Sequence, residues 1–422
     1  MNCPTRKGSS GAPYFDYQGR VRAIHNEGPC SPPDWIGPTT RYSESWATTT
    51  LGLIELAEAN GVYLVSGPDG SEPTSRQRNL YDSGAAAVFQ AMPYTWPDAP
   101  RLGTNFWFGM VSNGSGFHDA NPIVSLIGNI GERFILGDFD GVHGSDILRI
   151  RETTFGVVDL WVAKWDWPLQ HFELMEQSLW KASACGKDQI LLVGDFNGDG
   201  LDDVACGEGA HDDSVENVVW KVIPATHQHG ASAAVWTDLP WGTLDDRYYV
   251  GDFTGDGRDD IARARFDSDE LSFVWSVLEA DTVPHDMGGG LYVLFDEFTP
   301  LEPEWNLSLG SVGDKFYIGD FDGDDRDDIL IAPAARDELR VSRSTGDSFA
   351  SSWHWGGGFY GSAKIYVGNY DGDHQGREDV AFALESWTTN EYVWWVRAST
   401  GAGFAPATVW SSGFASGGDP LY

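Results

Sequence analysis

The chain has 422 residues and a formal net charge of −36 at pH 7, with 19 Trp and 51 Gly. Proteins that bind nucleic acid need basic faces, so this charge argues against such a role. No apolar run reaches the length of about 18 residues that a membrane-spanning helix needs, and no such helix is predicted. Many tryptophans and glycines together favour numerous short strands joined by tight turns over long helices.

The charge is spread unevenly along the chain. Residues 1–60 hold five basic and six acidic residues, a net charge of −1. Subtracting this value from −36 leaves −35 for residues 61–422. A compositional step of this kind predicts a domain boundary near residue 60.

Residues 1–60 contain a serine motif. Gly8-Ser9-Ser10-Gly11-Ala12-Pro13 is followed by strand-like Arg20–Ile24 and then by His25-Asn26-Glu27-Gly28. This order resembles the nucleophile region of trypsin-like (chymotrypsin-fold) serine peptidases, especially their glutamyl-endopeptidase-like branch. The resemblance implies the C-terminal part of a β-barrel peptidase domain, with Ser10 in the nucleophile position. The N–H groups of Gly8 and Ser10 would then form the oxyanion hole.

The other members of a catalytic triad do not precede Ser10. In the peptidase family the base His and its orienting Asp come before the serine, whereas residues 1–9 contain no His, Asp or Glu. A serine without a base is a poor nucleophile, so we expect this chain alone to be inactive. The α/β-hydrolase order needs G-x-S-x-G, and residue 12 is Ala. The missing His and Asp are expected upstream of Met1, in a longer protein.

A short helix and a linker are predicted next. Thr48-Thr49-Thr50 can cap a helix from Leu51 to Ala59 that stops before Gly61, and a terminal helix also ends the peptidase domain of that family. Residues 61–100 are rich in turn-forming residues between Ser66 and Ser75 and in prolines between Tyr94 and Pro100. We therefore expect residues 61–100 to be a linker.

Residues 101–422 repeat one pattern. An apolar strand with Trp, such as Val274–Val277, leads through a glycine turn to a strand that often holds another Trp. A polar turn, a further strand, an acidic loop and a last strand follow. About four strands per unit predict the blades of a β-propeller, and recurring tryptophans predict packing between blades. Residues 417–422 parallel the strand before a loop, so the segment would supply five to six blades.

The acidic loops place oxygen-bearing side chains at positions 1, 3, 5 and 9. They begin at Asp138, Asp195, Asp252, Asp320 and Asn369, which are 57, 57, 68 and 49 residues apart, and are called loops 1 to 5. Such spacing indicates a repeat architecture. Calcium takes six to eight oxygen ligands, and glycines allow a tight loop to aim them at one point. An EF-hand is excluded, because position 12 is never Glu and strand-like runs flank the loops.

With these features, residues 101–422 resemble the FG-GAP (or VCBS-type) repeats of integrin α-chain heads and many secreted bacterial proteins. In that family the loop joins two strands of a propeller blade and holds Ca²⁺. The resemblance implies Ca²⁺ as cofactor, bound by Asp138, Asp140, Asp146, Asp195, Asn197, Asp199, Asp203, Asp252, Thr254, Asp256, Asp260, Asp320, Asp322, Asp324, Asp328, Asn369, Asp371, Asp373 and Asp379.

The five loops are not equivalent. Loop 4 has Asp325 where loops 2 and 3 carry Gly, loop 3 has Thr254 at position 3, and loop 1 has Val142 at position 5. Loop 5 contains two extra residues, so that Asp379 takes the closing role. We expect loops 2 and 4 to have the highest calcium affinity, loop 3 the next, and loops 5 and 1 the lowest.

The cysteines bear on location. Four cysteines allow three pairings, of which Cys3–Cys30 with Cys185–Cys206 is local in sequence. An even count beside calcium loops favours an oxidising, extracellular setting.

The expected function is that of a secreted calcium-binding propeller that offers loops to a protein or glycan. The alternative is a secreted serine endopeptidase in the full-length protein, with the propeller as an accessory domain.

Overall fold

The computed structural model describes residues 13–15, 21–25, 47–49, 87–96, 99–118, 125–129, 132–141, 145–166, 171–173, 179–209, 218–226, 230–237, 240–286, 292–334, 336–357, 363–386 and 391–416. Four features that the sequence singled out lie outside these residues: Ser10 and Gly8, the pair Cys3 and Cys30, Val142, and the helix predicted over 51–59.

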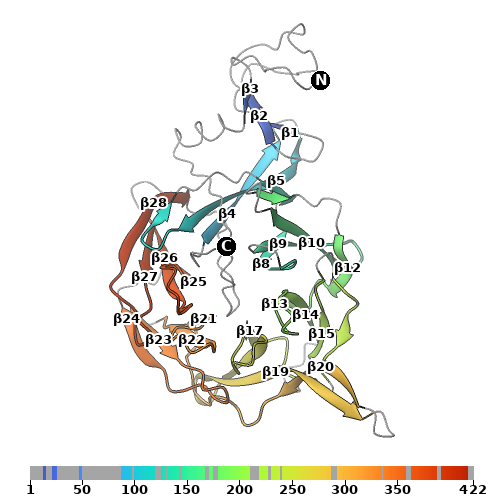
Figure 1. Cartoon of the computed structure of the whole chain (residues 1–422), viewed down its shortest axis with the longest axis vertical. Coiled ribbons are helices and arrows are strands. Elements are labelled where there is room, and N and C mark those ends of the chain that lie inside the picture. The colour runs from blue at the N-terminus through green and yellow to red at the C-terminus, as the bar shows by residue number, and fades with distance from the viewer. Residues whose placement is uncertain are drawn as a thin grey trace.

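The described residues form an all-β propeller (Figure 1). Five antiparallel blades, called blades 1 to 5, each begin with an inner strand, an acidic loop and a second strand. Their strands are β8 (Arg133–Gly137), β9 (Asp146–Glu152), β10 (Val157–Asp166), β11 (His171–Glu173) and β12 (Leu179–Gly186) in blade 1; β13 (Ile190–Gly194), β14 (Asp203–Glu208), β15 (Val219–Ile223) and β16 (Ala234–Val235) in blade 2; β17 (Arg247–Gly251), β18 (Asp260–Asp267), β19 (Ser272–Asp286) and β20 (Tyr292–Pro300) in blade 3; β21 (Lys315–Gly319), β22 (Asp328–Ala332), β23 (Glu338–Ser342) and β24 (Trp353–Gly357) in blade 4; and β25 (Lys364–Gly368), β26 (Asp379–Glu385), β27 (Glu391–Arg397) and β28 (Thr408–Ser416) in blade 5.

Two further sheets precede the five blades in the chain. The first joins β1 (Pro13–Phe15), β2 (Val21–His25) and β3 (Ala47–Thr49). The second joins β4 (Ala87–Trp96), β5 (Ala99–Ser112), β6 (Phe117–His118) and β7 (Ser125–Asn129) and lies between blades 5 and 1 of the ring (Figure 1). Strand β4 belongs to the segment that the sequence assigns to a linker, and it pairs with β5 from Ala87 to Trp96.

Tryptophans on the third strands fill the gaps between neighbouring sheets. Trp275 of blade 3 is fully buried, and its ring lies 5.1 Å from that of Phe316 in blade 4. Trp220 of blade 2 lies 5.1 Å from Tyr248 of blade 3 in the same way. Edge-to-face contacts of this kind stabilise aromatic pairs beyond their buried area. The repeated tryptophan therefore packs between blades, as the sequence repeat predicts.

The aromatic residue at position 2 of each loop makes a second contact between blades. Phe253 of loop 3 is fully buried and packs edge-on against Phe349 of blade 4, with ring centres 5.4 Å apart. The carbonyl of Phe253 accepts a hydrogen bond of 2.6 Å from the Ser344 hydroxyl. Phe321 of loop 4 is bound by Phe404 and Ser399 of blade 5 in the same two ways.

The same pair of contacts joins blade 5 to the β4–β7 sheet. Tyr370 of loop 5 packs edge-on against Phe117, with ring centres 5.7 Å apart, and its carbonyl accepts a hydrogen bond from the Ser112 hydroxyl. On the other side of the sheet, Trp107 packs against Phe134 of blade 1 at 5.0 Å. The β4–β7 sheet therefore closes the ring through contacts that also operate between the blades.

Tyr370 departs from the other loops, which carry Phe at position 2. Its hydroxyl is buried without a hydrogen-bond partner, and burial raises its pKa well above the ordinary value. We expect Tyr370→Phe to increase the free energy of unfolding by about 1 kcal/mol, because it removes an unsatisfied buried hydroxyl. Urea unfolding with calcium present measures this change. Phe321→Tyr, the reverse change one blade earlier, should destabilise; a loss of stability in Tyr370→Phe would contradict this interpretation.

Candidate metal-binding loops

Hairpin geometry brings the first and last residues of each loop together. In blade 2, Gly194 at the end of β13 pairs with Asp203 at the start of β14, so Asp195 lies beside Asp203. The same register joins Gly251 to Asp260 and Gly319 to Asp328. An antiparallel pair therefore places positions 1 and 9 at one point, and the intervening turn carries positions 3 and 5 above them.

The turn requires unusual backbone angles. In loop 2, Gly198 and Gly200 have φ values of 72° and 92°, a left-handed conformation that glycine adopts without strain. In loop 4, Asp325 occupies the position of Gly200 with φ of 64°. Asp tolerates this region better than most residues, because its short polar side chain can form local hydrogen bonds. The replacement noted in the sequence thus keeps the loop shape.

An acidic residue at position 8 connects each loop to the preceding one. The Asp259 side chain of loop 3 accepts a hydrogen bond of 2.8 Å from the N–H of Asp195, and its own N–H donates to the Asp195 carbonyl at 2.9 Å. Asp202 binds Asp138 in this way, and Asp327 binds Asp252. We call this pair of bonds the latch. It explains Gly194, where a Cβ would lie 2.8 Å from an Asp259 oxygen.

The latch is incomplete between loops 4 and 5. Glu378 occupies position 8 there, and its N–H donates to the Asp320 carbonyl at 2.9 Å. Its longer side chain passes Gly319, and both carboxylate oxygens are buried without a hydrogen-bond partner. Burial and the nearby Asp327 and Asp320 raise the pKa of Glu378 well above its usual range. The backbone of Asp320 lowers this pKa, but burial has the larger effect, so the junction holds a buried carboxyl group that is stabilised only in part.

In loop 2 the first and closing aspartates are buried, whereas Asp199 at position 5 is exposed. Asp195 accepts hydrogen bonds from the N–H groups of Asp199 and Gly200, at 3.1 and 3.0 Å, which fixes its orientation. Asp203 is fully buried; its Oδ1 accepts a bond of 2.7 Å from Ala225, and its Oδ2 has no partner. Burial, followed by the charges of Asp199 and Asp195, raises the pKa of Asp203 well above its usual range.

Among the described residues, loop 4 holds one of two compact carboxylate triads. Oxygens of Asp320, Asp322 and Asp328 all lie within 4.8 Å of one another. Asp328 is fully buried with Oδ2 unpartnered, and Asp322 has its Oδ1 buried without a partner. Burial and the charge of Asp322 raise the pKa of Asp328 well above its usual range, and burial raises the pKa of Asp320 to about 6.

Loop 1 holds the second compact triad, formed by Asp138, Asp140 and Asp146 within the same 4.8 Å limit. Within the described ranges, the carboxylates of loops 2, 3 and 5 form no triad this tight. In loop 3, Asp260 is fully buried, and Oγ1 of Thr254 is buried without a hydrogen-bond partner. In loop 5, Asp379 accepts hydrogen bonds from Asp371 and Ser399 at 2.8 and 2.7 Å.

These loops fit a bound cation. Buried carboxylates of one sign are costly unless a positive charge or hydrogen-bond donors compensate them. Asp203 Oδ2, Asp328 Oδ2 and Asp322 Oδ1 have neither hydrogen-bond partner nor water access, and they lie beside further carboxylates. The aspartate triads could hold a metal ion such as calcium, since hard cations prefer an all-oxygen donor set of this kind.

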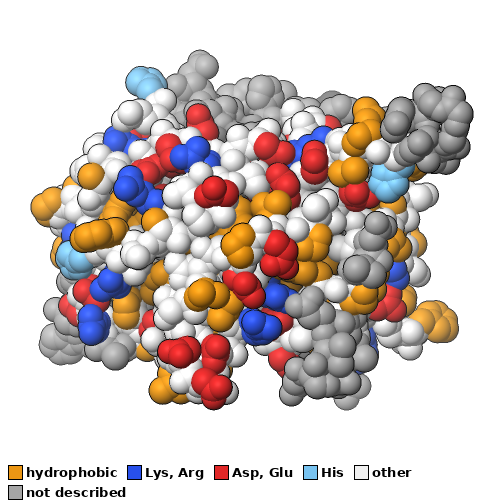
Figure 2. Space-filling view, turned by 90° about the horizontal axis from the view of Figure 1, so that it is seen from below, with side chains coloured by type: hydrophobic (Ala, Val, Ile, Leu, Met, Phe, Trp, Pro, Cys, Tyr) orange, Lys and Arg blue, Asp and Glu red, His pale blue; other side chains and the backbone are white. Residues whose placement is uncertain are grey.

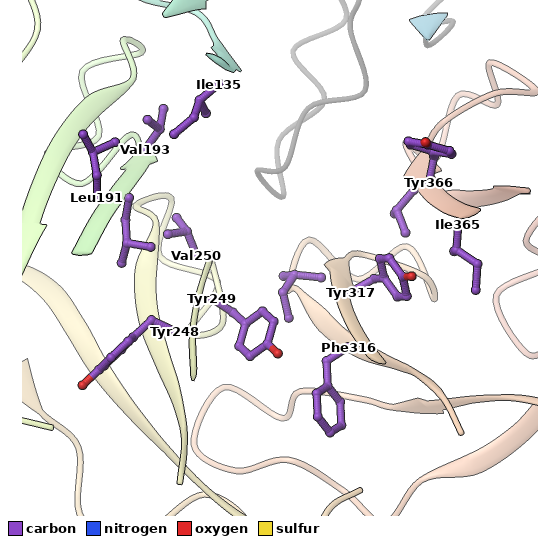
Figure 3. Close-up of a pocket in the computed structure, with 13 residues that line it drawn as sticks. Ile135, Leu191, Val193, Tyr248, Tyr249, Val250, Phe316, Tyr317, Ile365 and Tyr366 are labelled. Carbon is purple, nitrogen blue, oxygen red and sulfur yellow. The ribbon is translucent and has the colours of Figure 1, made fainter. Parts of the chain in front are cut away.

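A cavity of about 380 Å³ lies at the centre of the ring (Figure 3). The inner strands of all five blades line it with Ile, Leu, Val, Phe and Tyr side chains, and none of these lining residues is charged. Tyr249, Tyr317 and Tyr366 occupy the same repeat position on β17, β21 and β25, and burial raises the pKa of Tyr317 to about 12. The cavity thus offers no carboxylate pair for acid–base chemistry.

Other features of the chain fit the predicted location in part. Cys185 of blade 1 and Cys206 of blade 2 form a disulfide, which belongs to the pairing that is local in sequence. No helix among the described residues is long and apolar enough to cross a membrane. On the face shown in Figure 2, acidic side chains are interspersed with basic and hydrophobic ones, so that this face presents no single acidic patch.

Comparison with known proteins gives no assignment. No protein-family model matches the chain, and no curated protein matches it. The resemblances to FG-GAP repeats and to trypsin-like peptidases therefore stay predictions, and the argument for a metal site depends on the loop geometry.

Sequence reasoning predicts a set of ligand positions, but it does not predict the latch. The signal was present, because an acidic residue precedes the closing Asp in loops 2 to 5: Asp202, Asp259, Asp327 and Glu378. From sequence alone, each of these four residues can be interpreted as a metal ligand or as a charge on the protein surface. Only the three-dimensional structure shows that position 8 contacts a loop about 60 residues earlier.

The raised pKa of Asp320 predicts that the folding stability of the metal-free chain increases as the pH falls. Its folded pKa of about 6 exceeds the ordinary value near 3.9, so the folded chain binds more protons between these values. Lowering the pH from 8 to about 5.5 should therefore raise the urea midpoint in metal-stripped buffer. Asp320→Asn should weaken this dependence. A midpoint that falls steadily over the same pH range would contradict the burial of unneutralised carboxylates.

Proposed function

We propose that the chain is a calcium-binding β-propeller whose loops 1 to 5 each hold one ion. The observation that carries the proposal is Asp328, a fully buried carboxylate with an unpartnered oxygen, within 4.8 Å of oxygens from Asp320 and Asp322. A bound divalent cation would supply the missing interaction. The chain would contribute the carboxylate oxygens, and backbone N–H groups would hold Asp320 in place.

Calcium suits these loops better than magnesium. Mg²⁺ demands near-ideal octahedral geometry and keeps several waters, whereas Ca²⁺ accepts six to eight oxygens in a flexible arrangement. Loop 2 offers Asp195, Asn197, Asp199 and Asp203, a mixed set of three carboxylates and one amide. Its position-5 side chain lies on an exposed turn, which leaves room for water ligands. This combination is typical of a calcium site.

The metal's role would be structural. The position-1 residues of loops 1, 2 and 3 receive the latch from the next blade, and the residue after them packs between blades. An ion that orders a loop therefore also orders the junction beside it. The resulting rigid ring would serve as a binding module in an extracellular setting, with which the Cys185–Cys206 disulfide is consistent. The partner proposed from sequence is a protein or glycan that contacts the loops.

Calcium should raise the stability of the full chain. A ligand that binds only the folded state adds about 2.7 kcal/mol per site at a free concentration of about 100 Kd. We expect chelation with EGTA to lower the melting temperature by several degrees and re-addition of Ca²⁺ to restore it, with Mg²⁺ less effective. Differential scanning calorimetry measures the shift. A melting temperature indifferent to calcium would refute a structural metal.

A pair of variants in loop 4 provides the matched control. Asp328→Asn should remove one calcium equivalent and lower stability in calcium, yet raise or preserve stability in EGTA, where it removes an uncompensated buried charge. Asp325→Asn also removes one negative charge from the loop, but residue 325 is exposed, and Asn tolerates its left-handed backbone. It should keep the calcium count. Equal losses in both variants would show that general charge, and not ligation, governs binding.

Serine endopeptidase activity of a longer protein is the second candidate. Its support is the motif around Ser10 and the paired strands β1 and β2 that follow it, with Tyr14 opposite Ala23. This chain alone should not react appreciably with a fluorophosphonate probe, because no His or Asp precedes Ser10 to activate it. Gel fluorescence after labelling, with Ser10→Ala as the blank, tests this expectation. Robust labelling lost in the Ser10→Ala variant would show that a base is supplied from elsewhere in the chain.

A further inference from the structure

One position on the third strand of every blade faces the acidic loop. In blades 2 to 5 the closing aspartate accepts a hydrogen bond of 2.7 to 3.0 Å from a third-strand or adjoining N–H, those of Ala225, Ala280, Ser344 and Ser399. The residue immediately before that donor lies opposite the closing aspartate. We call it the facing residue. In blade 1, where Ile147 pairs with Ala163, the facing residue is Lys164. In blades 2 to 5 it is Pro224, Glu279, Arg343 and Ala398.

The facing residue can reach position 3 of the loop. In loop 4, Arg343 lies 3.0 Å from Oδ2 of Asp322. In loop 1, Nζ of Lys164 lies 3.1 Å from Oδ2 of Asp140. Directly opposed residues of an antiparallel pair point to the same face of the sheet, which explains why both cations meet the loop. In these two blades an acidic position 3 is therefore matched by a basic facing residue.

Loop 3 differs at both of these positions: position 3 is not acidic, and the facing residue is acidic instead of basic. Position 3 is Thr254, a neutral side chain whose Oγ1 is buried without a hydrogen-bond partner. The facing residue is Glu279. Ile261 pairs with Leu278, so in the antiparallel register Glu279 lies opposite Asp260 and on the same face of the sheet. The N–H of Ala280, the next residue, donates to Oδ1 of Asp260 at 3.0 Å, which fixes the third strand beside the loop at this point.

We propose that Glu279 is a further metal ligand of loop 3, supplying from the third strand the carboxylate that Thr254 does not provide. The inference rests on the proposed calcium function of the loops. Glu279 is half-buried and lies opposite Asp260, and an ion held by Asp252, Asp256 and Asp260 would take its carboxylate as a fourth one. The ligand is a divalent cation of the calcium type, because every donor is a carboxylate or hydroxyl oxygen.

With Glu279 as a ligand, the expected order of calcium affinities among the loops changes. Loop 3 with Glu279 carries four carboxylates, Asp252, Asp256, Asp260 and Glu279, for a charge of −4. Loop 4 also has four carboxylates, Asp320, Asp322, Asp324 and Asp328, but Arg343 pairs with Asp322 and Arg326 with Asp324, and −4 + 2 leaves −2. Since ligand charge tunes calcium affinity, loop 3 should bind at least as tightly as loop 4.

The test compares Glu279→Gln with Asp281→Asn in the full chain. Both variants remove one negative charge from the same strand two residues apart, and Asp281 is exposed. Calcium bound per chain is measured by equilibrium dialysis across a range of free Ca²⁺. Glu279→Gln should weaken one site by at least about tenfold, since even outer-shell partners of a metal cost 10–100-fold when removed. Asp281→Asn should leave all sites within about twofold of wild type.

A rescue variant distinguishes ligation from misfolding. Thr254→Asp in the Glu279→Gln background places a carboxylate at position 3, as in loops 1 and 4, and should restore the lost site. Identical calcium-binding curves for Glu279→Gln and Asp281→Asn would overturn the role of Glu279, and so would a failure of Thr254→Asp to restore the site. In both cases loops 2 and 4 would still bind calcium. If the wild-type chain binds no calcium in any loop, the proposed function itself fails, and the role of Glu279 fails with it.

Discussion

The structure depends on keeping several carboxylates of like charge in buried positions at the junctions between blades. Asp203, Asp260 and Asp328 are fully buried, and burial raises the pKa of each. Each receives one backbone N–H on Oδ1, and Asp260 receives two more on Oδ2, which compensates only part of the desolvation cost. A divalent cation is the simplest remaining compensation, because it interacts with several of these groups at once and adds folding free energy when it binds.

The same loops also join the blades, so metal binding and ring assembly involve the same residues. Asp195 illustrates this double use: its side chain is held inside loop 2 by Asp199 and Gly200, while its N–H and carbonyl belong to the latch with Asp259. The following residue, Phe196, packs against Phe298 of blade 3. Disorder in one loop would therefore loosen a hydrophobic contact in the next blade. At the junction between blades 4 and 5 the backbone bond from Glu378 to the Asp320 carbonyl is present, but neither carboxylate oxygen of Glu378 has a hydrogen-bond partner.

Much of this arrangement follows from sequence, because the repeat makes each loop a local hairpin. The spacing from position 1 to position 9 and the flanking strands depend on residues within one unit, and the hairpin register of loops 2 to 4 agrees with this spacing. What could not be predicted depends on contacts across units. Asp259 meets Asp195 from 64 residues away, and the β4–β7 sheet meets blade 5 through Ser112 and Tyr370, 258 residues apart. Glu279 was missed because the motif ends at Asp260, whereas strand pairing sets which third-strand residue faces the loop.

The most direct measurement of the central claim is a crystal structure of the full chain grown with Ca²⁺ and recorded at a wavelength where calcium scatters anomalously. The account predicts anomalous peaks inside the loops, with oxygens of Asp195, Asp199 and Asp203 at about 2.3–2.6 Å from the ion in loop 2. An equivalent peak should lie among Asp320, Asp322 and Asp328 in loop 4. Well-ordered loops without anomalous density, their carboxyl groups bonded to each other or to water, would contradict it.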